Sequence, residues 1–470
     1  MPIKNRRLAF FIFSLIAAGP NPAAFAQTQL SMKAAIRMGI DNYGTVKAKQ
    51  QYAAASKDEV IRAKRDYLPN LNFQAQVDYG TVNLQYGPLY GFGGLTASSV
   101  GPPTGTQNWS AAFGSLYLTN VNWDFFAFGR SKANIRTAMA TAERDNKDWQ
   151  QEIFQQQVRV AGTYLNLLAA QRLTASYREN LYLADTFRST VVQRVLNDLN
   201  PGVDSSQANA EVADAKIALT NAIDFQQAQE NQLLQLLGIP PQHLVVDTFF
   251  VTRLPASIPD SGGVKVTAAH PALQYYNSRI LLSDQLAKYD QTLAYPTFTL
   301  VGIYQLHGSG FGSAYGSQSP GDYTHSIYDG IRPDQTNYLF GLGITWNFTN
   351  VSRTSHLVWS QRSISKGLQD EIDLATQQLA AQLLLSETRM QNALENYREA
   401  PIEVNSAAEA YAQKADLYAN GLTTLVDVTQ ARYELIRAET NRDITFSNVW
   451  QALLLKAAAT GDMNIFLQNF

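Results

Sequence analysis

Apolar residues recur at helical spacing over an unusually long part of this chain, residues 130–238. One face carries Phe154, Val158, Ala161, Leu165 and Leu168, at steps of four and three. Between 131 and 197 there is no proline and one glycine, Gly162. Such a helix spans roughly 100 Å at 1.5 Å per residue, so it must pack on other long helices. The interruption at 200–204 predicts a long helical hairpin.

Strict alternation of apolar and polar residues predicts two β-strands before this hairpin. The first strand alternates Leu71, Phe73, Ala75, Val77 and Tyr79 with polar residues, and the second carries Tyr117, Thr119, Val121, Trp123 and Phe125. Residues 80–112, rich in Gly, Pro, Ser and Tyr, predict a long loop. A single helix is expected over 30–64, ended by Pro69.

The same order of elements begins again at His270. A helix is expected to about Ala294, followed by a strand from Phe298, a loop at 305–335, a strand at 338–348 and a long helix from near Arg353. Adding 223 carries Trp123 to Trp346, Arg130 to Arg353, Asp204 to Asp427 and Gly238 to Gly461, and adding 227 carries Pro69 to Pro296. The chain is therefore an internal duplication. We divide it into a first repeat at 27–238, a linker at 239–267, a second repeat at 268–461 and a tail at 462–470.

The N-terminus has the pattern of a secretory signal at 1–26. Three basic residues precede an apolar run at 8–18, and Ala24-Phe25-Ala26 has the form of a cleavage site. A membrane anchor is the alternative, but the run is too short to span a bilayer. Removing the signal takes the formal charge from −2 to about −5. This acidic balance gives no basic block that would indicate nucleic-acid binding.

The residues that usually carry catalysis or bind metals form no recognisable motif. There is no cysteine, which excludes disulfides, thiolate metal sites and a lipid-modified cysteine. The histidines, at 243, 270, 307, 325 and 356, lack ligand spacing, and no phosphate-binding, dinucleotide-binding or nucleophile motif is present. We expect no enzyme, no cofactor and no metal site, with any energy for transport supplied by a partner.

The strand pattern alone leaves two interpretations open, a sandwich core in water or a membrane barrel. No run of 18 apolar residues follows residue 26, so a membrane-spanning part would have to be a closed barrel. Aromatic residues at strand ends favour the barrel, in which they form a belt. This predicted aromatic belt comprises Trp123, Trp346, Phe125, Phe348 and Tyr79. Four strands cannot close a barrel, whereas three chains would supply twelve.

The order of elements, the duplication and the two helix turns resemble the TolC-type outer-membrane efflux and secretion channels. The turns read LYANGLTTLVDVTQA at 417–431 and GVDSSQA at 202–208. The resemblance implies a homotrimer with a 12-stranded barrel in the outer membrane, continued by a 12-helix tunnel in the periplasm. It also implies a periplasmic adaptor (a membrane fusion protein) and an inner-membrane pump of the RND, ABC or MFS type as partners. Outer-membrane lipid would surround the barrel.

The resemblance places a gate at the two turns. Asp427 and Asp204 match the family's ring of aspartates, and Tyr418 matches a residue that ties neighbouring helices shut. Gln430 stands where a second aspartate is often found and Thr423 where a basic partner can sit, which implies a weaker charge ring and fewer salt bridges. The alternative is that both aspartates only cap helices, because glutamine follows each of them by three residues.

The tips of the turns would contact the adaptor. The tip residues are Gly421, Gly202, Asn200 and Pro201. A second hypothesis for the whole chain is a periplasmic coiled-coil adaptor or scaffold without a membrane barrel, whose long hairpin has a similar pattern. The duplicated strand pairs favour a passive exit channel of an efflux pump or type I secretion system. The sequence leaves the substrate open, with a weak preference for small molecules.

Overall fold

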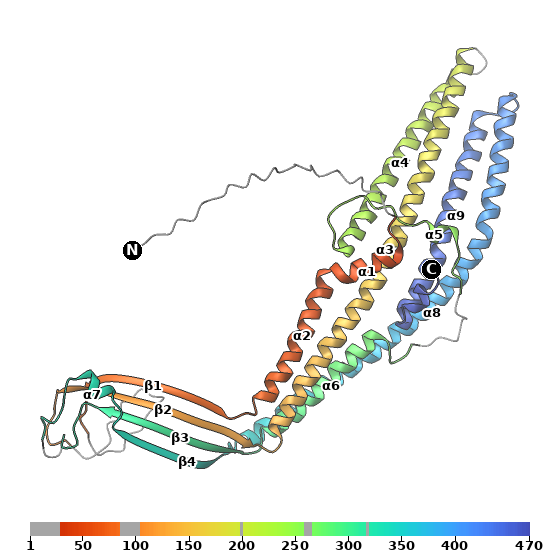
Figure 1. Cartoon of the computed structure of the whole chain (residues 1–470). Helices are drawn as coiled ribbons and strands as arrows, with labels where there is room; N and C mark the ends of the chain where they lie inside the picture. Colours follow the sequence, from red (N-terminus) through yellow and green to blue (C-terminus); the bar gives the residue numbers. More distant parts are fainter. Residues whose placement is uncertain (1–28, 85–103, 198–200, 258–265, 316–318) are drawn as a thin grey trace, which may run out of the picture.

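The computed structural model describes residues 29–84, 104–197, 201–257, 266–315 and 319–470. The predicted signal at 1–26 and the tip residue Asn200 lie outside these ranges. The molecule is elongated, with a four-stranded sheet at one end and two helical hairpins that reach the other (Figure 1). The observed fold is therefore mainly helical with a small antiparallel sheet, as the pattern predicts.

Four helices run side by side away from the sheet: α2 (Gly44–Arg65), α3 (Arg130–Leu196), α6 (Pro271–Thr292) and α8 (Asn350–Ala419) (Figure 1). Helix α3 pairs with α4 (Gly202–Leu237), and α8 pairs with α9 (Leu425–Thr460), to form the two hairpins. The bounds of α4 and α9 differ by 223 at both ends, and those of α2 and α6 differ by 227. The long hairpins predicted from periodicity are confirmed.

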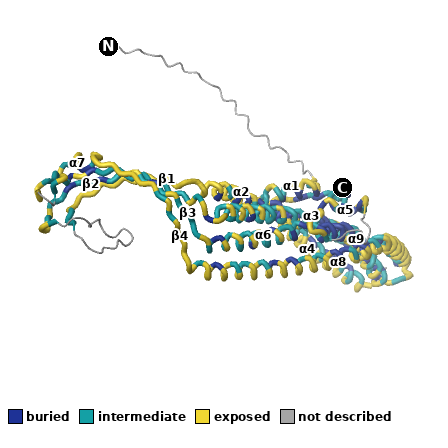
Figure 2. Tube along the Cα trace, turned by 90° about the horizontal axis from the view of Figure 1, so that it is seen from below, coloured by how far each residue is buried: buried dark blue, intermediate teal, exposed yellow. Residues whose placement is uncertain are grey.

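The sheet is antiparallel throughout, with strands in chain order: β1 (Asn70–Thr81), β2 (Ala111–Phe126), β3 (Thr297–Ser309) and β4 (Gln335–Thr345). Asn70 lies opposite Asn122, and the residues 227 and 223 further along, Thr297 and Thr345, lie opposite each other too. The two hairpins of the sheet thus have the same register. Strands β1 and β4 are the edges of the sheet and are exposed along nearly their whole length (Figure 2).

One face of this sheet carries apolar and aromatic side chains, because residues opposite each other across a ladder share a face. The most exposed members of the face lie on the two edge strands: Leu71, Phe73, Tyr338, Phe340 and Leu342, each between 69% and 80% exposed. On β1 the other face carries the polar row Asn72, Gln74, Gln76 and Asp78. So large an exposed apolar surface indicates contact with lipid or with another chain.

The buried core lies where the hairpins meet the rest of the chain (Figure 2). Trp450 donates a hydrogen bond to the carbonyl of Arg253 at 2.9 Å, and Tyr164 donates one to the carbonyl of Leu30 at 2.6 Å. These bonds connect helices to the segment predicted as a linker, which contains α5 (Phe249–Thr252). The predicted tail 462–470 likewise forms a short helix, α10 (Asn464–Leu467), and Phe466 is fully buried in this core.

The helix expected over 30–64 is wrong as a single element. The chain forms α1 (Met32–Asn42) and α2, separated at Tyr43, whose backbone is extended at φ −64° and ψ 124°. Gly238 ends α4 in the left-handed region, and a Cβ there would lie 3.0 Å from the carbonyl oxygen of Asn42. Tertiary packing against α4 therefore accompanies a break that the alanine-rich sequence does not indicate.

The predicted second loop also holds more structure than expected. Strand β3 continues through Ser309, and α7 (Ile327–Ile331) follows before β4. The hydroxyls of Ser115 and Tyr117 both donate to the carbonyl of Ile331, at 3.2 Å each. Because Ser115 and Tyr117 are on the apolar face, this segment covers the loop end of that face.

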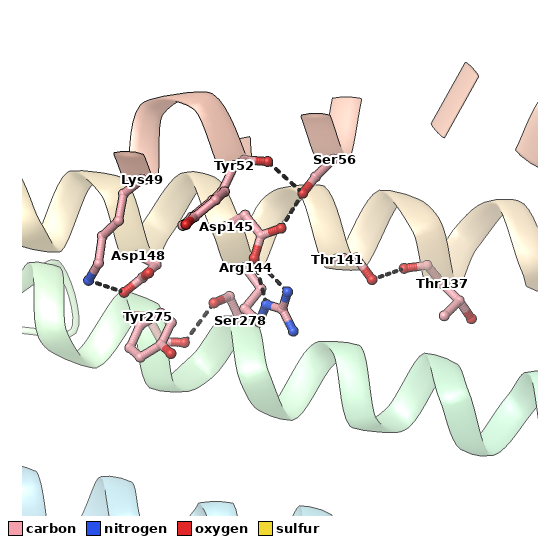
Figure 3. Close-up of polar contacts among 10 residues, drawn as sticks. All are labelled: Lys49, Tyr52, Ser56, Thr137, Thr141, Arg144, Asp145, Asp148, Tyr275 and Ser278. Carbon is pink, nitrogen blue, oxygen red and sulfur yellow. Dashed lines mark hydrogen bonds and ion pairs between the residues drawn. The ribbon is translucent and has the colours of Figure 1, made fainter. Parts of the chain in front are cut away.

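Polar contacts hold α2, α3 and α6 together along their length (Figure 3). Lys49 on α2 forms ion pairs with Asp148 at 2.9 Å and Glu152 at 3.0 Å on α3. Ser56 on α2 donates a hydrogen bond to Asp145 on α3. These contacts link neighbouring helices and contribute to keeping the helices in register.

Candidate gate at the helix turns

The second turn is a tight connection built around Gly421. This glycine has φ +74°, and the N–H of Leu422 donates to the carbonyl of Leu417 at 2.9 Å, which closes the end of α8. Helix α9 then begins at Leu425 with Thr424 as its N-cap. The turn therefore has a fixed backbone, and it presents Thr423 and Thr424 to the first turn of α9.

Asp427 is the third residue of α9 and completes a capping box with Thr424. The hydroxyl of Thr424 donates to Oδ2 of Asp427 at 2.6 Å, that of Thr423 does so at 2.9 Å, and the Thr424 N–H does so at 3.2 Å. The sequence-based pairing of Asp427 as cap with Gln430 is wrong, because Thr424 occupies the N-cap and Asp427 the third helical position. The hydrogen bonds from Thr424 and Thr423 lower the pKa of Asp427 to about 2.

Lys414 on α8 supplies the basic partner that sequence reasoning missed. Its ammonium lies 3.8 Å from Oδ1 of Asp427, while Thr423 serves as a hydrogen-bond donor to the same carboxylate. The two are thirteen residues apart, across the turn, so only the antiparallel register of α8 and α9 brings them together. The carboxylate is ionised, has hydrogen-bond donors on Oδ2, and is half-exposed.

The first turn has a different construction. Pro201 is the N-cap of α4 and provides no side-chain acceptor, and Gly202 is the first helical residue. The predicted capping box of Asp204 with Gln207 is wrong, because Asp204 also lies in the first helical turn and not at the cap. Instead, Oδ2 of Asp204 accepts a hydrogen bond from the hydroxyl of Tyr418 at 3.4 Å. The side chain is thus used between hairpins.

Tyr418 lies in a small apolar cluster between the two hairpins. It is 6% exposed and packs with the buried residues Val191, Ala208, Leu425 and Val428. The ring of Phe187 lies 5.8 Å from the ring of Tyr418, and the guanidinium of Arg194 lies 5.5 Å from it. Arg194 also donates to the carbonyl of Ala419 at 3.1 Å. Arg194, which sequence reasoning missed, therefore joins α3 to the end of α8.

Gln430 lies on an exposed part of α9 and donates to Glu434 at 3.0 Å. It borders a groove of about 540 Å³ between α3, α4 and α9. In this groove the buried Arg432 donates to the carbonyl of Asn180 at 2.5 Å. Burial raises the pKa of the neighbouring Glu211, and the positive charge of Arg432 opposes that shift.

The predicted aromatic belt divides into two groups at opposite ends of the sheet. At the helix end, the ring of Trp123 lies 6.1 Å from that of Phe125, and Trp346 lies 4.6 Å from Phe348. The indole of Trp123 donates to the carbonyl of Tyr67 at 2.8 Å, and that of Trp346 donates to the equivalent carbonyl of Ala294 at 3.1 Å. Tyr79 lies near the loop end, 4.6 Å from Phe113.

A β-bulge between Trp123 and Phe126 brings a further aromatic residue onto the apolar face. It places Phe126 opposite Phe298, with the two rings 5.8 Å apart. Alternation alone selected Phe125 and missed Phe126, because a bulge adds a residue to one strand and changes its phase.

Within the described ranges, no group of three or more His, Cys, Asp or Glu side chains could hold a metal ion. None of the helices in those ranges is both long and apolar enough to cross a membrane.

The model of the outer membrane efflux protein family matches residues 40–239 and 264–443 of the chain. The chain belongs to this family. It is an outer-membrane protein, and the match includes both helix turns and all four strands. No curated protein sequence gives a significant match to this outer membrane efflux protein.

Several solved structures share the fold of this outer membrane efflux protein. CusC, described with transmembrane channel formation, has a TM-score of 0.73 at 12% identity, and the alignment covers 93% of each chain. The outer membrane protein VceC from Vibrio cholerae has a TM-score of 0.70 at 15% identity, covering 92% of this chain and 96% of VceC. The outer membrane channel CmeC of Campylobacter jejuni has a TM-score of 0.71 at 12% identity, covering 92% and 85%.

Proposed function

We propose that this protein is the exit channel of a tripartite efflux pump or of a type I secretion system. Three copies form a 12-stranded barrel in the outer membrane, continued by a 12-helix periplasmic tunnel. The channel conducts substrate passively, with energy supplied by an inner-membrane pump of the RND, ABC or MFS type through a periplasmic adaptor. The family's efflux description supports this role.

The observation that carries the proposal is the sheet with two unpaired edges and one exposed apolar face. Four strands leave the hydrogen-bonding groups of β1 and β4 unsatisfied, and these groups are costly to expose in lipid. Closure with other copies would satisfy both edges and turn the apolar face outward. Over the ten residues from Phe113 to Trp123 the strand rises about 33 Å, which suits a tilted crossing of a bilayer.

The helices support the tunnel part of the proposal. Helices α3 and α8 are 67 and 70 residues long and lead directly from β2 and β4. At roughly 1.5 Å per residue they reach about 100 Å from the membrane. The division into repeats at 27–238 and 268–461 is part of the proposal, since each repeat supplies two strands and one hairpin.

We assign the gate to the turns, with Asp427, Asp204, Tyr418, Gln430 and Thr423 as its residues. Three ionised Asp427 carboxylates around one axis would attract cations and repel one another, which raises their pKa values against the hydrogen bonds described above. Tyr418 with Asp204 holds the hairpins of one chain together. The tips at Gly421, Gly202, Asn200 and Pro201 are the proposed adaptor contact.

The alternative of a periplasmic adaptor or scaffold leaves the four-stranded sheet and its exposed aromatic residues without a role. The experiment is extraction of the mature protein from membranes and measurement of its mass in detergent. A trimer that requires detergent supports the channel, and a monomer that stays dispersed without detergent contradicts it. Deleting the gene and comparing drug sensitivity with the secreted proteome then separates efflux from protein secretion.

A further inference from the structure

The contact between the two repeats inside one chain is made by residues whose counterparts at the ends of the chain are exposed. Arg130 is the central residue of this internal contact. Its guanidinium donates to the hydroxyl of Thr297 at 3.0 Å and to the carbonyls of Tyr295 at 3.1 Å and Thr292 at 3.4 Å. Arg130 therefore fastens the start of α3 to the corner between α6 and β3.

The counterpart of Arg130 in the second repeat is Arg353, which is exposed at the start of α8. The counterparts of its three acceptors are Asn70, Leu68 and Arg65, which form the corner between α2 and β1. Asn70 has a side-chain oxygen that can accept from a guanidinium, as the Thr297 hydroxyl does. Within one chain, α2 and α8 lie on opposite sides of the row α2, α3, α6, α8, so this contact needs a second copy.

Apolar contacts at the internal corner have exposed counterparts as well. The ring of Phe128 stacks on that of Tyr295 at 5.4 Å, and Phe126 packs on Phe298. The counterparts of Phe128, Tyr295 and Phe298 are apolar residues that are at least half exposed: Val351 at 50%, Leu68 at 61% and Leu71 at 69%. Burial of these side chains against one another would remove apolar surface from water.

The charges along the helices are complementary. At the internal contact, Lys147 on α3 donates to the side chain of Gln274 on α6 at 3.0 Å. The counterparts are Asp370 on α8 and Lys47 on α2, both exposed. A neutral acceptor for one lysine is thus replaced by an oppositely charged pair at the matching place, which also fixes which copy's helix lies beside which.

The register of the strands can be carried over in the same way. Inside the chain, Thr119 on β2 lies opposite Tyr304 on β3, and both strand hairpins keep the offsets of 223 and 227. The counterpart of this pair is Leu342 on β4 opposite Val77 on β1. A shift of one residue would turn the apolar row of one strand to the other face, and a shift of two would misplace Arg353 relative to Asn70.

We propose that β4 and α8 of one copy bind β1 and α2 of the next, with Leu342 opposite Val77, Arg353 on the α2–β1 corner and Asp370 paired with Lys47. This inference rests on the proposed function for the number of copies, three. The head-to-tail contact repeats the internal one, so successive copies close a ring. Every junction in the assembly then has the same geometry, within a chain or between chains.

The chain has no cysteine, which makes disulfide trapping specific. The test pair is Val77→Cys with Leu342→Cys, and the matched controls combine Leu342→Cys with Ala75→Cys or Tyr79→Cys on the same face. Opposite residues have Cβ atoms about 5 Å apart and diagonal ones about 7 Å, and a disulfide needs about 4 Å. We expect roughly tenfold more linked product from the test pair than from either control.

Reversing charges provides a second, independent measurement. Asp370→Lys and Lys47→Asp should each lower the temperature at which the oligomer dissociates, and the two together should restore it. Preferential linking of a control pair, or failure of the double reversal to restore stability in an oligomer that still forms, overturns the proposed junction alone. Linking of neither pair in a native-sized trimer also overturns it, whereas absence of any oligomer overturns the proposed function.

Discussion

The hydroxyl of Tyr418, at the end of α8, donates a hydrogen bond to Oδ2 of Asp204, in the first turn of α4, at 3.4 Å. This bond joins the second hairpin to the first near their tips. The tyrosine ring is buried in the apolar cluster between the hairpins, while its hydroxyl reaches the carboxylate. Packing and hydrogen bonding at the candidate gate can therefore be separated by substitution.

Tyr418→Phe removes the hydroxyl and keeps the ring. We expect a more frequently open channel, by about fivefold, because a hydrogen bond to a charged group contributes roughly 1 kcal/mol or more. Single-channel recording measures the open fraction. Tyr182→Phe, on the exposed surface of α3, is the control and should leave it unchanged. An unchanged open fraction in Tyr418→Phe would remove this bond from the gate.

Asp427→Ala tests whether the carboxylate does more than cap α9. It should abolish the preference for cations and the block by added divalent cations, because the proposed charge ring is lost. Thr424→Ala is the matched variant, since it removes the N-cap hydroxyl, at a cost of roughly 1 kcal/mol, and leaves the carboxylate. If the two variants have the same ion selectivity as the parent, Asp427 is only a capping residue.

The low pKa of Asp427, about 2, predicts how the gate responds to acid. Because the pKa in the folded protein is below the unfolded value of about 3.9, the stabilisation by this carboxylate is complete above that value and is lost as the pH falls toward 2. Cation block should therefore persist at pH 4. Replacing both Thr423 and Thr424 by valine should raise the pKa and weaken the block at pH 4 relative to pH 7. Equal pH dependence in both proteins would contradict this cause.

His270 predicts a separate pH effect on stability. Its Nδ1 accepts from the N–H of Ala272 at 3.1 Å and its Nε2 lies 3.1 Å from the carbonyl of Ala458, an arrangement that suits the neutral ring. Burial lowers its pKa, and the bond to Ala458 opposes this. The unfolded state binds more protons below about pH 6.5, so stability should fall as the pH drops from 7 to 5. His270→Asn should reduce that slope of the thermal midpoint against pH.

Gly461→Ala should destabilise the fold strongly. Gly461 ends α9 at φ +77°, and a Cβ there would lie 2.7 Å from the ring and 2.9 Å from the Cα of His270. We expect a loss of about 2 kcal/mol or more, from strain and displacement of His270. Gly367→Ala is the matched control, since it lies within α8 with open space around its Cα, and it should stabilise the protein by about 0.5 kcal/mol. Chemical denaturation of both variants measures the difference.

Periodicity predicted the fold well because the seams of α3 and α8 and the alternation in β1 and β4 are long and uninterrupted. The break at Tyr43 was missed because its cause is packing against Gly238, far along the chain. Turn chemistry identified Asp427 and Asp204, but the caps were assigned three residues too late. Lys414 and Arg194 could not be identified, since their partners depend on the register of antiparallel helices.

The most direct test of the account is single-channel conductance of the purified protein in planar lipid bilayers. The proposed trimeric channel predicts discrete, cation-selective conductance steps from a detergent-purified trimer, with larger open fractions in Tyr418→Phe. A protein of trimeric mass that inserts into the bilayer and never conducts, or one that does not insert at all, would contradict the proposal that this chain forms the exit channel.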